Sequence, residues 1–241
     1  MRSGNRSKLL PSKGVLSIGA LVASIVGVMC SYASGSGEGL ASSRWTEQRI
    51  LLSGFEFVFR VPGGESSASP SLPTISKVDL GRDLPKDRPS LVVYGHSWDW
   101  EGWFWQGVFG TLTMHVAVIG RPDDYSKDLM ALENLEELID RNLTRTLGQH
   151  NEELRQKGVR GSVVTPPEAY KRVTLHDRTW LVYSLVGQDR TTYVTPLTPT
   201  RYLGVVFFFV DNSRAYKTTW RREAQPIADQ IAKSLELRKA E

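Results

Sequence analysis

The sequence predicts an α+β domain built on a mainly antiparallel sheet that is sandwiched by helices. Three observations lead to this fold class. An alternating strand pattern stands at residues 55–61, one long amphipathic helix pattern stands at 127–147, and apolar strands followed by a second helix pattern complete the chain. Strands and helices that come in blocks, rather than in strict alternation, are typical of α+β domains.

The first 33 residues have the three parts of a secretory signal peptide. Four basic residues come first, an apolar run covers 14–30, and small residues at 31 and 33 predict cleavage after Ala33. An uncleaved membrane anchor and a lipoprotein modified at Cys30 are the alternatives. We therefore expect export to the periplasm or the medium, or tethering to a membrane through the N-terminus. The basic residues are Arg2, Arg6, Lys8 and Lys13.

This segment also carries the net charge and the only cysteine. The chain has 30 Lys and Arg against 26 Asp and Glu, a formal charge of +4, and all of that excess precedes Ser34. The basic isoelectric point therefore gives no reason to expect nucleic-acid binding by the mature chain. Without Cys30, the mature chain would have no disulfide, no thiolate metal ligand and no cysteine nucleophile.

Residues 34–53 are predicted to form a flexible leader, and residues 54–241 a single domain. The stretch at 34–44, SGSGEGLASSR, has the Gly/Ser composition of a tether. In FEFVFRV, at 55–61, phenylalanines alternate with other residues, which predicts a half-buried strand. A short strand is expected around Ile75–Leu80, between loops rich in Pro, Gly and Ser.

The clearest helix is predicted over 127–147. Asp124 or Ser126 would cap its start, and Gly148 would end it. Glu136 falls within the apolar stripe and is expected at its solvent margin. The stripe consists of Leu129, Leu132, Leu135, Ile139, Leu143 and Leu147.

After residue 170 the sequence predicts strands and then a final helix. A hairpin is expected to turn at Asp177-Arg178. The run Val205–Val210 is apolar at consecutive positions, which predicts a strand buried on both faces. Pro226 would start or kink the C-terminal helix. That helix is predicted from Trp220, Ala224, Ile227, Ala228, Ile231 and Leu235.

The stretch HSWDWEGWFWQG, at 96–107, holds four of the seven tryptophans. A two-residue turn at Glu101-Gly102 would make residues 90–119 one long Trp-rich hairpin, in which opposed residue numbers sum to 203. Trp98 would then face Trp105, Trp100 would face Trp103, and all four would share one face. This face would be either core beneath a helix or an exposed contact for a partner, a sugar or a bilayer. We expect the tip pair, Trp100 and Trp103, to be partly exposed. The predicted contact residues are Trp98, Trp100, Trp103, Trp105 and His96.

No pattern in the sequence predicts catalysis, a metal site or a cofactor. In GHSWD the hydrolase elbow would need a second glycine where Asp99 stands, so Ser97 is expected to be an ordinary strand serine. The four histidines are scattered without metal-ligand spacing, and no glycine-rich phosphate loop is present. Glu133, Glu136 and Glu137 are expected to be solvated on the helix surface.

The order of three segments resembles the PsbP-like superfamily, a group that includes small exported bacterial proteins of unknown function. The segments are GFEFVFRVP, the mid-chain amphipathic helix, and YLGVVFFFVDNS closed by W…IADQIAKSLEL, and the resemblance covers roughly residues 54–237. It implies a non-enzymatic binding and assembly module, and it supplies no catalytic residues.

We therefore expect an exported, non-catalytic cell-envelope protein that binds a protein partner or a small ligand through a shallow surface. The alternative is an envelope hydrolase whose site lies outside the known motifs. Such a site would appear as a pocket with a perturbed carboxylate or histidine.

Overall fold

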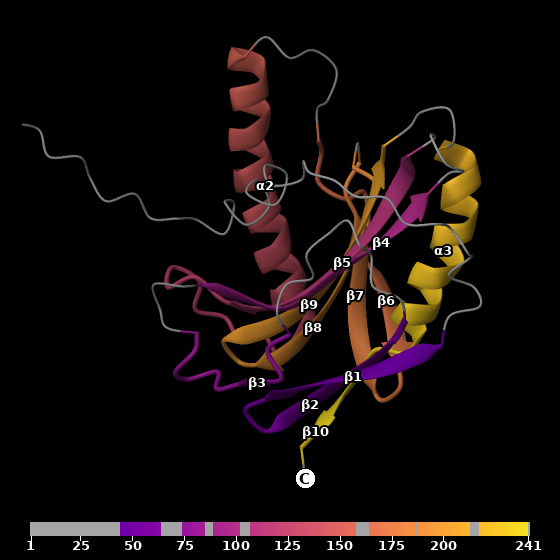
Figure 1. The fold of residues 1–241 in the computed structure, drawn as a ribbon. Helices are drawn as coiled ribbons and strands as arrows, with labels where there is room; N and C mark the ends of the chain where they lie inside the picture. The colour runs from indigo at the N-terminus through magenta and orange to yellow at the C-terminus, as the bar shows by residue number, and fades with distance from the viewer. Residues whose placement is uncertain are drawn as a thin grey trace, which may run out of the picture.

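The computed structural model of the protein describes residues 44–63, 74–84, 89–101, 107–157, 164–186, 188–212 and 217–240. The predicted signal peptide at 1–33 and most of the predicted leader lie outside these residues. Within them the chain forms two mainly antiparallel sheets and two helices (Figure 1), so the predicted α+β class is confirmed. Neither of these helices is long and apolar enough to cross a membrane.

The smaller sheet has four strands in the order β10-β2-β1-β3. β1 pairs with β3 in parallel, and the other neighbours are antiparallel. Its strands are β1 (Trp45–Leu52), β2 (Phe55–Pro62), β3 (Lys77–Val78) and β10 (Glu236–Lys239).

The larger sheet has six antiparallel strands in the order β4-β5-β9-β8-β7-β6. Its strands are β4 (Ser90–Glu101), β5 (Val108–Gly120), β6 (Lys171–Leu175), β7 (Arg178–Ser184), β8 (Arg190–Thr198) and β9 (Arg201–Asp211).

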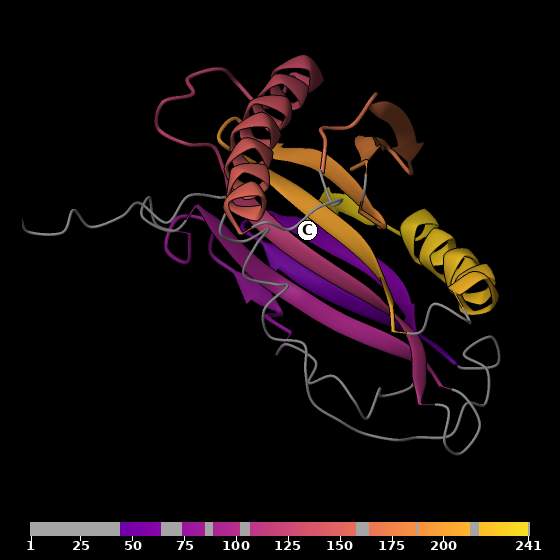
Figure 2. The same cartoon turned by 90° about the horizontal axis from the view of Figure 1, so that it is seen from above.

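The two faces of the larger sheet are covered differently, as Figure 2 shows. Helix α2 (Leu132–Gln156) lies on one face, while the smaller sheet and helix α3 (Lys217–Lys233) cover the other. The prediction that helices alone would cover both faces of the sheet is therefore wrong for one face, where a second sheet lies beside α3. β2 pairs with β1 and β10 rather than with the larger sheet, and so it forms a separate layer.

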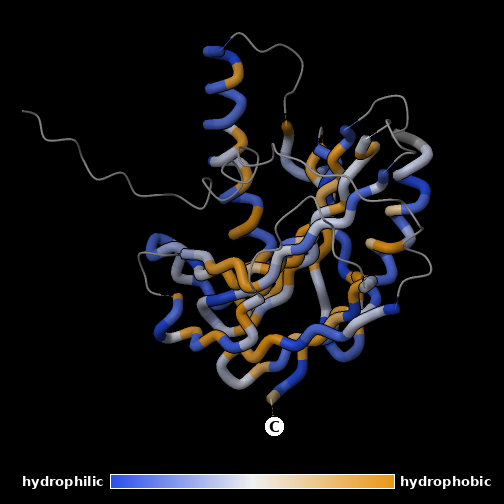
Figure 3. The backbone as a smooth tube through the Cα atoms, in the orientation of Figure 1, coloured by the Kyte–Doolittle hydropathy of each residue, from blue (hydrophilic) through white to orange (hydrophobic). Residues whose placement is uncertain are grey.

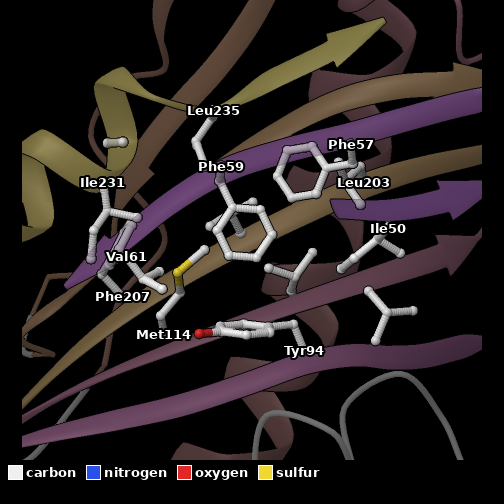
Figure 4. Packing of buried hydrophobic residues seen from close by; sticks show 14 of the residues in the cluster. Ile50, Phe57, Phe59, Val61, Tyr94, Met114, Leu203, Phe207, Ile231 and Leu235 are labelled. Carbon is white, nitrogen blue, oxygen red and sulfur yellow. The ribbon is translucent and has the colours of Figure 1, made fainter. Parts of the chain in front are cut away.

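The main core lies between the two sheets and α3. Figure 4 shows side chains from β2, β9 and α3 meeting there, with Phe59 close to Tyr94. The ring centroids of Phe59 and Tyr94 are 4.9 Å apart, and those of Phe57 and Phe59 are 5.1 Å apart. Aromatic side chains bury large apolar areas, so this cluster supplies much of the hydrophobic stabilisation of the fold.

Strand β1 corrects the predicted domain boundary. It covers residues 45–52, which the sequence suggested were leader, and it buries Ile50 and Leu52 completely. The two-residue turn Ser53-Gly54 joins it to β2, and both residues have positive φ, of 39° and 92°. A turn of this kind suits the twist of a hairpin, so Gly54 belongs inside the domain and does not mark its start.

Helix α2 begins and ends later than predicted. Its N-cap is Ala131, whose side chain carries no acceptor, so neither Asp124 nor Ser126 caps the helix as predicted. Gly148 lies inside the helix, which continues to Gln156 through mostly polar residues (Figure 3). The buried residues of the helix lie within 135–147 and include four of the predicted stripe, whereas Leu129 is buried before the helix begins and Leu132 is half-buried. Glu136 stays at the margin with a partly exposed side chain.

The predicted C-terminal helix is confirmed with a different end. Pro226 lies inside α3, and the helix stops at Lys233. Leu235, which the pattern assigned to the helix, is fully buried in the segment that leads into β10. The hairpin of β6 and β7 turns at His176-Asp177, one residue earlier than predicted, with His176 at φ 51°.

Candidate functional site

The Trp-rich hairpin forms, but with a different register from the predicted one. β4 and β5 pair antiparallel, with Trp98 opposite Leu112 and Trp100 opposite Gly110. The numbers of these opposed residues sum to 210 and not to 203. The predicted turn at Glu101-Gly102 is therefore wrong, because β4 continues through Glu101. Trp103 and Trp105 lie outside the described residues, and their role in contacting a partner stays a prediction.

Trp98 and Trp100 belong to the core beneath the smaller sheet and α3. Their exposed fractions are 1% and 9%, so the expected exposure of Trp100 is wrong. The indole N–H of Trp98 donates to the carbonyl oxygen of Pro62 at 3.4 Å, and the rings of Trp100 and Trp220 lie 5.7 Å apart. The register explains this burial, because Gly110 opposite Trp100 has no side chain and leaves room for the Trp220 ring.

His96 and Ser97 continue the same strand. The His96 ring is half-buried between Tyr94 and Trp98, at centroid distances of 6.4 and 4.7 Å. The Ser97 hydroxyl is buried and lies 2.9 Å from the Thr113 hydroxyl on β5. Ser97 is thus a strand serine, as predicted.

A cavity of about 100 Å³ lies on the opposite face, between α2 and the larger sheet. Its roof consists of side chains from successive turns of α2, and its floor comes from β4, β5, β7, β8 and β9. Val206 and Phe208 on its floor are half-buried, so the cavity is open to solvent at that end. The residues contributed by α2 are Ile139, Asn142, Leu143 and Thr146.

Two buried polar atoms of the cavity wall have no hydrogen-bond partner. They are Nδ1 of His115 on β5 and Nδ2 of Asn142 on α2. Buried polar groups are nearly always paired, because an unpaired one loses its bonds to water without replacement. A cavity that holds two such atoms among apolar side chains has the composition of a small-molecule site.

Arg190 on β8 supplies the positive charge of the cavity. It is 9% exposed, its Nε donates to the Thr192 hydroxyl at 3.2 Å, and its guanidinium carbon lies 5.3 Å from the ring centroid of Phe208. Among the described residues that line the cavity there is no aspartate and no glutamate.

Burial shifts the ionisation of the groups around this cation. Burial, together with the positive charge of Arg190, lowers the pKa of His115, so the imidazole is held neutral. Burial raises the pKa of Tyr183 and of Tyr202, which also line the cavity and stay protonated. The cavity therefore presents one fixed cation surrounded by neutral groups.

The sequence contains one signal for this cavity, in β9. The run Val205–Val210 is apolar at every position, and we expected both faces to be buried. Val205 and Phe207 are buried in the main core, but Val206 and Phe208 are only half-buried and Val210 is exposed. The protein itself therefore covers this face of β9 incompletely at the cavity.

A second, shallow hollow at the start of α2 is acidic. Arg172 pairs there with Glu133 at 3.0 Å and with Glu136 at 3.7 Å, and Lys127 pairs with Glu137. These carboxylates are well exposed, as the sequence predicted, and no cluster of metal-ligating side chains occurs in the described parts of the chain. Exposed ion pairs of this kind contribute little stability and indicate no ligand.

Comparisons with known proteins give one structural likeness. No family model and no curated protein matches the sequence. The solution structure of cyanobacterial PsbP (CyanoP) from Synechocystis sp. PCC 6803 aligns with a TM-score of 0.32 and 14% sequence identity, over 85% of this chain and 97% of that one.

Proposed function

We propose that the protein is a non-catalytic binding protein whose ligand is a small, largely apolar molecule held between α2 and the larger sheet. The observation that carries this proposal is the cavity itself, with its two unpartnered polar atoms at His115 and Asn142. The cavity replaces the shallow binding surface that we expected from the sequence.

The composition of the wall supports binding over catalysis. Its described residues include no carboxylate, lysine or cysteine that could serve as an acid, base or nucleophile beside His115. Nδ1 of His115 also has no partner that would orient the ring, whereas a catalytic imidazole is held in place by one. The polar atoms are thus suited to orienting a ligand.

Binding of a neutral ligand tests this proposal. We expect benzyl alcohol, titrated into ¹⁵N-labelled protein, to shift the backbone amide signals of α2 and of β5, β8 and β9 near Asn142, His115 and Thr192. Ala117→Leu adds volume inside the cavity and should remove these shifts. Thr191→Leu on β8, whose side chain points to the other face, is the matched control. Unchanged binding to Ala117→Leu would place the ligand elsewhere and overturn the proposal.

The buried, neutral His115 in a cavity also favours a second candidate, a hydrolase without a known motif. We expect no esterase or peptidase activity that depends on it. A clear activity that is lost in His115→Gln, with binding of benzyl alcohol retained, would support the hydrolase instead.

We further propose that the chain is exported to the cell envelope, on the basis of its basic and apolar N-terminal segment. N-terminal sequencing of the protein from the secreted fraction should then begin at Ser34. A protein that starts at Met1, or one with a lipid-modified Cys30, would contradict cleavage after Ala33.

A further inference from the structure

The starting point is that Arg190 is buried and that no carboxylate among the described residues pairs with it. Its polar contacts within the protein are to neutral groups, the Thr192 hydroxyl and the Tyr183 hydroxyl, and it forms no ion pair with any described carboxylate. Burying an unpaired charge is costly, so buried arginines are nearly always paired with an anion.

Arg221 shows how the same fold treats a comparable arginine. Like Arg190, it stacks on a phenylalanine of β9, with its guanidinium carbon 5.4 Å from the ring centroid of Phe209. Arg221 is less buried, and yet it pairs with Asp189 at 2.6 Å and with Asp211 at 2.9 Å. Arg190 is more deeply buried than Arg221, yet no described carboxylate pairs with it, whereas two carboxylates pair with Arg221.

An anion can reach Arg190 from the cavity. Arg190 lines it together with the two unpartnered atoms of His115 and Asn142, and the amide Nδ2 of Asn142 is a donor that an anion can accept from. The guanidinium fork matches a carboxylate in geometry and forms strong, charge-assisted hydrogen bonds with it.

The remaining wall determines the rest of the ligand. Beyond the polar groups, the cavity is lined by apolar side chains, including Ala117, Leu143, Val206 and Phe208. A cavity of about 100 Å³ is somewhat smaller than an apolar cavity of about 150 Å³ that holds benzene, but it is open at Val206 and Phe208, so a ligand slightly larger than benzene extends toward solvent there. The ligand body is therefore compact and apolar.

We propose that the cavity binds a small amphipathic carboxylate, with its carboxylate on Arg190 and its apolar part between α2 and Phe208. This inference rests on the proposed function and specifies the class of ligand.

Matched acids and alcohols separate the charge from the apolar body. At pH 7 we compare benzoate with benzyl alcohol, and hexanoate with hexanol, by titration of ¹⁵N-labelled protein. Each acid should bind at least about tenfold more tightly than its alcohol, as expected for a charge-assisted pair. Arg190→Met should abolish this preference, so that each acid binds no more tightly to the variant than its alcohol does. Arg178→Met is the control, because Arg178 stacks on Phe55 outside the cavity and its loss should leave the preference intact.

A second measurement needs no variant. Benzoate bound beside His115 should raise the pKa of its imidazole, because a nearby negative charge favours the protonated ring, and benzyl alcohol should not. Equal binding of acid and alcohol to the unaltered protein, or an unmoved His115 titration with benzoate bound, would overturn the carboxylate inference while leaving the binding function in place. Failure of all four compounds to bind would overturn both.

Discussion

The two faces of the six-stranded sheet differ in how completely they are filled. Under the smaller sheet and α3, tryptophans, phenylalanines and Met114 pack into one continuous core. Under α2, the sheet meets a single helix whose buried residues lie within 135–147, and a cavity with unpartnered polar atoms remains beside it. The second face has a hydrophobic core of its own along α2, but one helix does not cover a sheet of this width, and the cavity lies where that cover is incomplete.

The largest difference should appear between two neighbours on β9. Phe207 is 1% exposed and points into the main core, whereas Phe208 is half-buried at the cavity. Phe207→Ala should lower the free energy of unfolding by about 3–5 kcal/mol, and Phe208→Ala by about 2 kcal/mol or less. Denaturant unfolding measures both variants. Equal losses would mean that the two faces are packed alike.

Two glycines sharpen the comparison. A Cβ at Gly110 would lie 2.0 Å from the Trp220 ring, whereas one at Gly204 would meet only ordinary contacts, the nearest at 3.4 Å to Ile119. Gly110→Ala should therefore destabilise the protein by about 1–3 kcal/mol through overpacking. Gly204→Ala should be neutral or should stabilise it by about 0.5–1 kcal/mol, because glycine is unfavourable inside a strand. Thermal and denaturant unfolding of the two variants measures both effects. A greater loss of stability in Gly204→Ala than in Gly110→Ala would contradict the assignment of the packed face.

Two asparagines on α2 test whether the cavity carries a stability cost. Nδ2 of Asn142 is unpartnered, whereas Asn151 donates to the carbonyl of Val164 at 2.8 Å and accepts its N–H at 3.2 Å. Asn142→Leu should raise the free energy of unfolding by about 1 kcal/mol, since it removes an unsatisfied donor and adds apolar contact. Asn151→Leu should lower the free energy of unfolding, because it breaks two hydrogen bonds. Destabilisation by Asn142→Leu would show that this side chain is already satisfied.

The smallest effect concerns pH. Burial and the charge of Arg190 lower the pKa of His115 in the folded protein, so the unfolded chain binds the proton more readily. Stability from this residue is then complete above about pH 6.5, the ordinary value for histidine, and declines as the pH falls below it. His115→Gln should lose less stability between pH 8 and pH 5.5 than the unaltered protein in denaturant unfolding. Identical pH profiles would mean that His115 is not desolvated.

Local patterns in the sequence predicted the elements well and their pairing poorly. The stripe from Leu135 to Leu147 and the alternation in β2 depend on neighbours along the chain, so periodicity found them. The register of β4 and β5 depends on where the turn lies, and one wrong turn at Glu101-Gly102 moved every opposed pair.

The cavity could be predicted only in part. The surplus of apolar residues in β9 is visible in the sequence, but the extent to which α2 covers them is decided by tertiary packing. Nothing local distinguishes Arg190, because the described side chains around it come from five strands and a helix, most of them distant in sequence. Likewise, the sequence left open whether the tryptophans form core or a contact surface, because the second sheet that covers Trp98 and Trp100 is distant in sequence.

A crystal structure of the protein under xenon pressure tests the contrast between the two faces most directly. Xenon enters open apolar space and does not enter a close-packed core. We expect xenon density between α2 and the sheet, beside Leu143 and Phe208, and none among Phe57, Phe59 and Phe207. A cavity without xenon, with α2 packed directly onto β8 and β9, would contradict a ligand site on this face.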